Sequence, residues 1–504
     1  MRTLRLIPAT AVMLLWAVSW PHVQAEVKSP PMGVPDRYNL SVIGGKAEDY
    51  CGDALPENAK RALHVKTVVA EWRGAKAGLM AEDVIYGAGG KVFEKNAYLE
   101  LADAIEAAES QTEDAKAQVV LKVQRTETTG SGKTTKSTTR TLEVTVAMRV
   151  FGEGAGKTIP GAALEKDILE RGAKWLAGEQ QADGSFFTTL SVENGLVVLT
   201  SIAGMALMAA GNTAEEGKYS AHVLRAAEFV METVGVQKKF KMIDGKRYDQ
   251  TNWSLGYGGL FLAWVYERAD KKWLGKSSLK RLKNKLEWVR DRILANMEDS
   301  GGFAAGPGGP NALGYVELEV MSNFVLASLG AIKAVGISVD DKKLEKAVAY
   351  VRACAGETGG VGYSTRPGEI RQQEVGRTAG AANAFAALGL TADPLYDRMQ
   401  KFVQKHVARA FGGHSTPTMH QLSVAIASYR AGPEAWEEYW RAQRREFTMV
   451  RSEDGAFSYR PTEDTKRLNI NLDRDLTRVW TTAHWLLILR LDDGAVPLWV
   501  AKPK

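Results

Sequence analysis

Several polar side chains stand where loops of this chain lead into apolar helical segments. The set holds one glutamate, two arginines and three of the seven histidines: Glu317, Arg377, His414, His420, Arg478 and His484. Histidine and glutamate exchange protons, and arginine holds carboxylates, so these residues could perform acid–base chemistry on a polymer. The three histidines could instead converge on zinc.

The same residues also have a purely structural interpretation, as helix caps and as partners of loop backbone groups. Arg377 and Arg478 are each followed within three residues by a threonine. This recurrence could reflect a repeated geometry, in which the arginine binds the carbonyl groups of a neighbouring loop or its aspartate. The sequence favours the structural interpretation, and it predicts neither a metal site nor a cofactor.

Aromatic residues occur at the same helix starts: Trp253, Tyr257, Tyr315 and Trp480. Such side chains could line a cavity and stack on sugar rings. Together with the polar set, they make a carbohydrate one conceivable ligand.

The elements that must position these residues repeat six times between Glu165 and Leu491. Each repeat has an amphipathic helix, a Gly-rich polar loop and a smaller, more apolar helix. The expected loops are residues 180–187, 248–259, 298–309, 357–368, 408–418 and 451–461. One helical hairpin cannot bury its own apolar face, so the repeats must stack. The contrast between apolar inner and charged outer helices predicts a closed (α/α)6 toroid around a central cavity.

Residues 33–152 read as a separate, small α+β domain. The β-branched run at 64–70, a glycine pair at Gly89 and Gly90, and alternating segments at 118–123 and 142–146 predict strands and a hairpin. Apolar residues at helical spacing predict a helix over 98–108. Gly74–Leu79 (GAKAGL) followed by this hairpin resembles PDZ domains of secreted bacterial proteins. That resemblance implies a peptide-binding loop, for which the candidate residues are Leu40, Ser41, Val42, Ile43, Gly44 and Gly45. An equal alternative is that this domain only packs on the toroid and braces it.

The loops Gln180–Phe186 (QQADGSF) and Glu453–Phe457 (EDGAF) resemble a recurrent element of the terpenoid-cyclase and protein-prenyltransferase toroid. The whole arrangement is similar to a DUF6288-like family of secreted bacterial proteins, a domain of unknown function. Residues 164–492 lack the D-x-D-D, D-D-x-x-D and D-x-C motifs that cyclisation and prenyl transfer need. The resemblance therefore implies the fold, and it implies no activity.

The first residues predict export from the cytoplasm. A basic start, an apolar run from Leu6 to Trp20 and small residues up to Ala25 are typical of a signal peptide cut after Ala25. We therefore expect a secreted or periplasmic protein without a membrane span after cleavage. The formal charge of +6 is spread along the chain, which argues against nucleic-acid binding. We expect Cys51 and Cys354 to be two separate buried thiols.

The sequence thus predicts a mainly α protein with a signal peptide (1–25), a PDZ-like domain (33–152), a linker (153–163), a toroid (164–492) and a C-terminal tail (493–504). The leading hypothesis is a binding or scaffold protein that takes an extended or C-terminal peptide at the PDZ-like domain and a glycan or small molecule in the toroid. The alternative is an extracytoplasmic carbohydrate- or polymer-active enzyme. A terpenoid cyclase or prenyltransferase is the weakest hypothesis.

Overall fold

The computed structural model describes residues 37–51, 55–129, 136–155, 159–189, 192–238, 241–243, 246–269, 275–308, 317–412, 416–468 and 471–496. These residues belong to one compact unit, Pro35–Lys504. The predicted signal peptide, Tyr315 and His414 lie outside the described residues. None of the described helices is long and apolar enough to cross a membrane.

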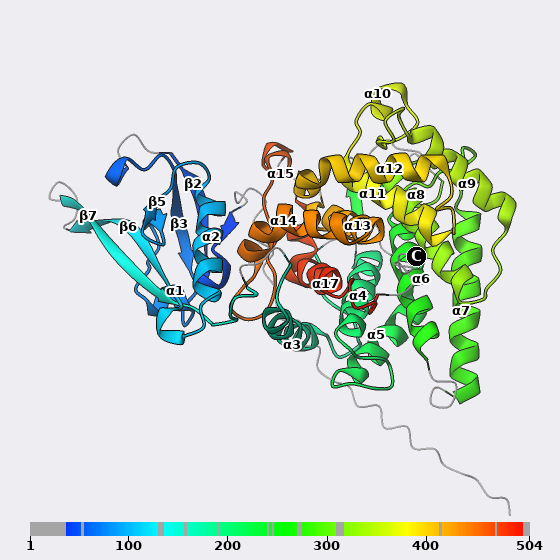
Figure 1. Cartoon of the computed structure of the whole chain (residues 1–504). Helices are drawn as coiled ribbons and strands as arrows, with labels where there is room; N and C mark the ends of the chain where they lie inside the picture. Colours follow the sequence, from blue (N-terminus) through cyan, green and yellow to red (C-terminus); the bar gives the residue numbers. More distant parts are fainter. Residues whose placement is uncertain are drawn as a thin grey trace, which may run out of the picture. The chain divides into compact units, whose positions relative to one another are not determined.

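Six inner helices form a closed ring. They are α4 (Val192–Ala209), α6 (Thr251–Arg268), α8 (Glu319–Ala334), α11 (Val375–Ala387), α13 (Pro417–Ala431) and α17 (Thr477–Leu489). Each packs against the next in chain order, and α17 packs against α4 (Figure 1). The contact between α17 and α4 closes the ring, so the predicted (α/α)6 toroid is confirmed.

Six outer helices surround the ring, and each packs against at least one inner helix. They are α3 (Ala162–Glu179), α5 (Ser220–Thr233), α7 (Gly275–Ala295), α9 (Asp341–Cys354), α12 (Pro394–His406) and α14 (Pro433–Val450). In α12, Leu395, Met399 and Val403 recur at helical spacing and are buried, while the opposite face is charged. The inner helices are instead buried almost all round and approach one another closely. A Cβ atom on Gly259 of α6 would lie 2.1 Å from Ser328 Oγ of α8.

Shorter elements connect these helices. They are the hairpin β8 (Lys241–Ile243) and β9 (Lys246–Tyr248), α10 (Pro367–Ile370), the 3-10 helix η5 (Val407–Gly412), α15 (Glu463–Leu468) and α16 (Leu472–Asp475). The prediction of a loop over 248–259 is wrong from Thr251 onward, because α6 begins at that residue. The glycines at 256, 258 and 259 suggested a loop, but they serve close packing inside a helix.

One type of hydrogen bond recurs in the hairpin loops. In four of them, a loop residue donates its backbone N–H to a Ser or Thr hydroxyl of the following inner helix: Phe186 to Thr200, Phe303 to Ser322, Val361 to Thr378 and Phe457 to Thr482. Two residues earlier, each loop has a glycine with positive φ: Gly184, Gly301, Gly359 and Gly455. These glycines abut the outer helix of the following repeat, and Gly455 abuts α3 of the first repeat. The recurrent loop motif therefore joins neighbouring repeats around the ring.

Replacing Gly184 with alanine is expected to lower the free energy of unfolding by about 2–4 kcal/mol. The φ of Gly184 is +90°, and an added Cβ would lie 2.3 Å from the carbonyl oxygen of Arg225, a backbone atom of α5. Urea unfolding measures the change. The control is Gly178→Ala in α3, where nothing lies within 4 Å of the added Cβ. Equal stability of the two variants would contradict this role of Gly184.

The N-terminal part of the described chain is an antiparallel sheet with strand order β1-β2-β3-β4-β6-β7, and β5 pairs with β4. The strands are β1 (Tyr38–Asn39), β2 (Gly45–Tyr50), β3 (Ala62–Val68), β4 (Val84–Ala88), β5 (Lys91–Val92), β6 (Gln118–Thr129) and β7 (Lys136–Ala147). Its helices are α1 (Arg73–Lys76) and α2 (Ala97–Glu109), with one 3-10 turn, η1 (Ser41–Ile43), between β1 and β2. The small sheet domain is thus present where the sequence predicts it, whereas its membership of the PDZ family stays a prediction.

Helix α14 of the toroid packs on α2 and η1 of the sheet domain. Arg451 Nη2 donates to Glu109 Oε2 at 2.7 Å, and both side chains are at least 96% buried, with exposed fractions of 4% and 3%. Asn39 Nδ2 donates to the carbonyl oxygens of Met449 and Arg451. Buried hydrogen bonds of this kind form in only one arrangement of the two parts, so they fix the sheet domain against α14.

Candidate functional site

The starts of α11 and α13 place Glu374 and His420 beside each other. Glu374 is the N-cap of α11, where its carboxylate accepts hydrogen bonds from the backbone N–H groups of Gly376 and Arg377, each at 2.8 Å. Glu374 Oε2 also lies 2.9 Å from Nδ1 of His420. Gly376 makes this approach possible, because a Cβ atom there would lie 2.1 Å from His420 Nδ1.

Two opposing effects act on the carboxyl group of Glu374. Burial raises its pKa, but His420, Arg377 and the backbone N–H of Gly376 together outweigh burial and lower the pKa to about 2. Glu374 is therefore ionised at every physiological pH.

Glu319, the first residue of α8, behaves in the opposite way. It is fully buried, and burial raises its pKa to about 8, with only partial compensation from Arg377 and Asn323. Among the described residues, neither of its carboxylate oxygens has a hydrogen bond of ordinary geometry. Glu319 is therefore protonated at neutral pH.

Asp473 of α16 completes the group. Its carboxylate accepts hydrogen bonds from the N–H and O–H of Thr418, at 2.9 and 2.7 Å, and from Trp480 Nε1 at 3.0 Å. Burial nevertheless dominates and raises its pKa to about 6. We call Glu319, Arg377, Glu374, His420 and Asp473 the polar row. Its three carboxyl groups have well-separated pKa values, a pattern that is typical of sites where one group gives a proton and another stays charged.

Arg377 is held inside the polar row. It is 5% exposed, its guanidinium lies over the ring of Tyr363, and Nη2 donates to the carbonyl oxygen of Gln372 in the preceding loop. Arg478 instead forms a two-bond ion pair with Asp454, at 2.9 and 2.6 Å. The expected binding of a loop carbonyl or a loop aspartate by these arginines is confirmed.

Two other predicted polar residues, His484 and Glu317, make different contacts. The Nδ1–H of His484 donates to the carbonyl oxygen of Trp480 at 2.8 Å, and burial lowers its pKa to about 3, so this histidine is neutral. Glu317 packs beside Gly302 and Tyr350, where burial and Glu298 raise its pKa. The sequence alone shows Glu319, Glu374 and Asp473 as acids near helix starts, but nothing in it distinguishes them from ordinary caps.

Aromatic side chains pack together at the N-terminal part of α6. Tyr257 lies 4.9 Å from Phe324 and 5.7 Å from Trp480, measured between ring centroids, and Trp253 lies 5.5 Å from Phe324. Tyr257 is 0% exposed and Trp480 is 2% exposed. Ligand contact by these aromatic residues stays a prediction, and in this structure they contact one another.

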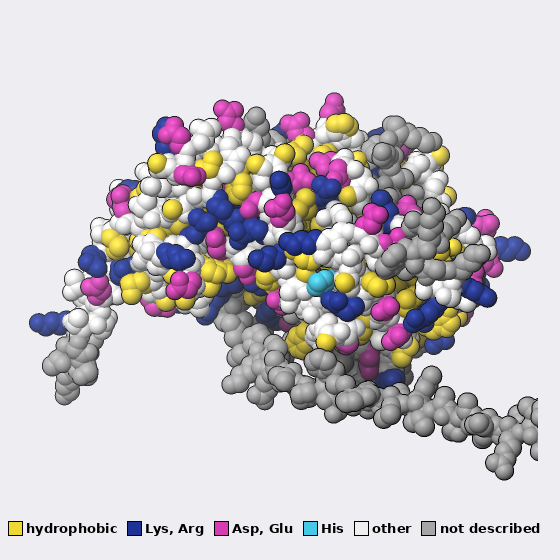
Figure 2. Space-filling model, turned by 90° about the horizontal axis from the view of Figure 1, so that it is seen from below, with side chains coloured by type: hydrophobic (Ala, Val, Ile, Leu, Met, Phe, Trp, Pro, Cys, Tyr) yellow, Lys and Arg dark blue, Asp and Glu magenta, His cyan; other side chains and the backbone are white. Residues whose placement is uncertain are grey.

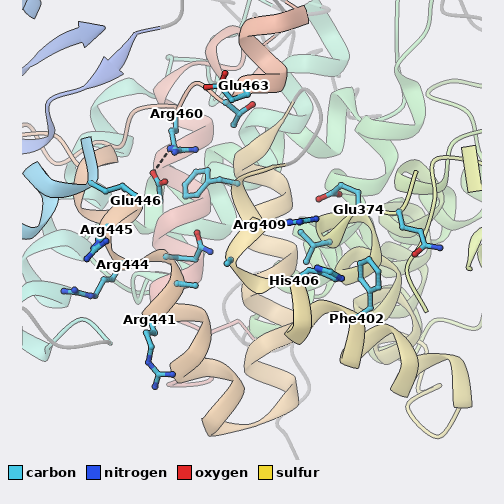
Figure 3. Close-up of a pocket in the computed structure, with 18 residues that line it drawn as sticks. Glu374, Phe402, His406, Arg409, Arg441, Arg444, Arg445, Glu446, Arg460 and Glu463 are labelled. Atoms are coloured by element: carbon cyan, nitrogen blue, oxygen red, sulfur yellow. Dashed lines mark ion pairs between the residues drawn. The ribbon is translucent and has the colours of Figure 1, made fainter. Parts of the chain in front are cut away.

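A cavity of about 1080 Å³ opens beside the polar row, and Glu374 forms part of its wall. Figure 3 shows Arg441, Arg444 and Arg445 on one side of this cavity, with Phe402 and His406 across from them. These residues come from α14 and α12 respectively. We call this cavity the arginine pocket. Glu374 thus connects the polar row with this open cavity.

The candidate peptide-binding segment is closed by packing. All six residues of 40–45 are buried, and Ser41 Oγ donates to the carbonyl oxygen of Thr448 in α14 at 2.6 Å. Strand β1 pairs with Lys46 and Ala47 of β2, which occupies that part of the sheet edge. Peptide binding at this segment stays a prediction, while the structure shows the segment supporting α14.

The remaining candidates for metal or redox chemistry do not form clusters. Cys354 is buried, as predicted, whereas Cys51 is exposed, so its prediction as a buried thiol is wrong. Within the part of the chain that the structure describes, no group of three or more His, Cys, Asp or Glu side chains could hold a metal ion.

Replacing Glu319 with glutamine is expected to remove part of the pH dependence of stability. The pKa of Glu319 rises from 4.5 in the unfolded chain to about 8 in the folded one. Between these values the folded protein keeps a proton that the unfolded chain releases, so wild-type stability falls as pH rises through this window. Urea unfolding at pH 8 should find Glu319→Gln more stable by roughly 1–3 kcal/mol, and the difference should shrink towards pH 5.

The control for this prediction is Glu345→Gln, on the exposed face of α9. Its difference from wild type should not change with pH. A difference for Glu319→Gln that is equally independent of pH would show that Glu319 ionises normally in the folded protein.

The chain was compared with known families and structures. Residues 165–488 match the family model described as a domain of unknown function, DUF6288. No curated protein matches the chain. Among solved structures, it is similar to the type II terpene cyclase MstE from Scytonema in complex with geranylgeranyl dihydroxybenzoate, at 12% identity and a TM-score of 0.42, covering 66% of this chain and 97% of that one.

It is also similar to an inactive variant of the α-1,6-mannanase GH76A of Salegentibacter sp. HEL1_6 in complex with α-1,6-mannotriose, at 9% identity and a TM-score of 0.42, covering 64% of this chain and 99% of that one. Likenesses this weak say nothing of the chemistry of the present chain. The family model, in contrast, spans well over half of it. The chain therefore belongs to the DUF6288 family.

Proposed function

We propose that the protein is an extracytoplasmic enzyme that cleaves a carbohydrate or another polymer by general acid–base catalysis in the arginine pocket. One observation carries this proposal. Glu374 lines the pocket, and the same carboxylate lies 2.9 Å from His420 in the interior. A carboxylate that contacts a buried histidine and also lines an open cavity is what proton transfer to a bound substrate requires.

The residues of the polar row have different roles in this proposal. Glu374, ionised and fixed by two backbone N–H groups, orients His420, whose Nδ1 lies 2.9 Å from its carboxylate. His420 is the group that transfers the proton, a common role of imidazole in catalysis. Arg377, which lowers the pKa of Glu374, and Asp473, whose pKa His420 lowers, are positioning residues.

The location rests on the first residues of the chain. The basic start, the apolar run and the small residues before Ala25 support export of a cleaved protein. A polymer outside the cytoplasm is a substrate that such an enzyme would meet.

A second candidate is the binding or scaffold function without catalysis. It is favoured by the helix-capping role of Glu374, which gives this residue a structural task whether or not chemistry occurs. It is also favoured by the burial of residues 40–45 against α14, which makes the sheet domain a support for the toroid.

Turnover decides between the two. The purified chain is incubated with a panel of acidic and neutral polysaccharides, and new chain ends are measured. The enzyme proposal expects cleavage of at least one polymer and its loss in His420→Gln. His222→Gln, a histidine of the outer helix α5, is the matched control and should keep full activity. Absence of cleavage across the panel, or full activity of His420→Gln, would favour the scaffold.

A further inference from the structure

The arginines that line the arginine pocket differ in whether an acidic side chain pairs with them. Three of its arginines already pair with acids. Arg444 pairs with Glu106, Arg445 Nε lies 2.8 Å from Asp103 Oδ1, and Arg460 Nε lies 2.6 Å from Glu446 Oε2. Such pairs fix the wall of the pocket and leave little charge for a ligand.

Arg441 and Arg409 are the remaining arginines of the pocket. Arg441 is exposed and pairs with Glu437 and Glu438 of its own helix, as surface arginines commonly do. Arg409 of η5 is exposed, and within the described residues no carboxylate forms an ion pair with it. The face of the molecule seen in Figure 2 carries both basic and acidic side chains.

An aromatic platform lies next to Arg409. Phe402 and His406 are one helical turn apart on α12, and their ring centroids are 4.5 Å apart. Burial, together with Arg409 and Lys405, lowers the pKa of His406, so its ring is neutral at pH 7. The pocket therefore offers one exposed cation beside two tilted, uncharged rings, with Glu374 on the same side (Figure 3).

We infer that the arginine pocket binds an acidic oligosaccharide, with an anionic group of the sugar on Arg409 and a sugar ring against Phe402 and His406. Guanidinium groups bind planar carboxylates and tetrahedral oxyanions through paired hydrogen bonds. A cavity of about 1080 Å³ is large enough for several sugar residues. The inference deepens the proposed function, on which it rests for treating the pocket as the substrate site. The shared ligand chemistry is a repeated anionic group, from either a uronate or a sulfated sugar.

Binding is measured on the full chain by isothermal titration calorimetry with three probes: an oligogalacturonate, a sulfated chondroitin fragment and neutral maltotetraose. We expect binding of at least one acidic probe, weaker binding at high salt, and no comparable binding of maltotetraose. Loss of a charged hydrogen-bonded partner in Arg409→Gln should weaken the acidic complex about 10–100-fold. Arg409→Lys, which keeps the charge without the paired donors, should fall between the two.

Arg281→Gln is the matched control, because Arg281 is an exposed arginine of α7 that does not line the pocket. It should bind the acidic probe as wild type does. Equal affinity for acidic and neutral probes, no binding of either acidic probe, or an unchanged affinity in Arg409→Gln would overturn the inference. Selective binding without turnover would uphold it and count against the enzyme, whereas cleavage of a neutral polymer alone would support the enzyme and overturn the inference.

Discussion

Replacing Glu374 with glutamine is expected to lower the turnover of any polymer that the wild-type protein cleaves by about 10²–10⁴-fold. Glutamine keeps the size of the side chain and one acceptor oxygen for the start of α11. It removes the negative charge 2.9 Å from His420 Nδ1, on which the proposed proton transfer depends. Initial rates at saturating substrate measure the effect, because the loss should appear mainly in kcat.

The cap at α11 makes a stability measurement part of this test. Loss of an N-cap costs about 0.5–2 kcal/mol, so Glu374→Gln should remain folded, with a modest decrease in the urea midpoint. The control is Glu437→Gln, which removes an exposed carboxylate of α14. If Glu374→Gln kept wild-type kcat while losing stability, Glu374 would be a helix cap alone.

Replacing Arg451 with methionine is expected to lower the free energy of unfolding by about 3–5 kcal/mol. The side chains of Arg451 and Glu109 are only 4% and 3% exposed, so removal of the arginine leaves a buried carboxylate without its counter-ion. Arg451 joins the end of α14 to α2 of the sheet domain, and its loss should also loosen that contact. Urea unfolding measures the first effect, and protease sensitivity of the sheet domain measures the second.

The double variant Glu109→Gln, Arg451→Met separates the two contributions. It removes both charges and should recover much of the lost stability, because a buried ion pair itself contributes little once desolvation is counted. Arg445→Met, which removes a more exposed arginine of α14, is the control and should cost less than about 1 kcal/mol. A loss this small for Arg451→Met would mean that water reaches Glu109.

The closed ring could be predicted because its causes are repeated along the chain. Each repeat has an amphipathic outer helix and an inner helix that is buried almost all round, and four of the loops have a glycine at a position of positive φ. Such helices must be covered all round, which leaves a ring of six as the solution. The same local signals predicted the strands and the helix of the sheet domain. The error at 248–259 arose because glycine marks both turns and close helix packing, and only the neighbour, Ser328, decides between them.

The sequence by itself thus determined the architecture of this protein, through periodicity, glycine positions and small inner residues. Only the tertiary structure decided which polar residues act together. It places Glu374 beside His420, pairs Arg478 with Asp454, and directs the Nδ1–H of His484 to the carbonyl oxygen of Trp480. It also decided that Leu40–Gly45 faces α14 and that the pocket lies beside α12 and α14. The physical reason is that periodicity is a local property of the chain, whereas burial, charge pairing and the resulting pKa values depend on neighbours that are distant in sequence.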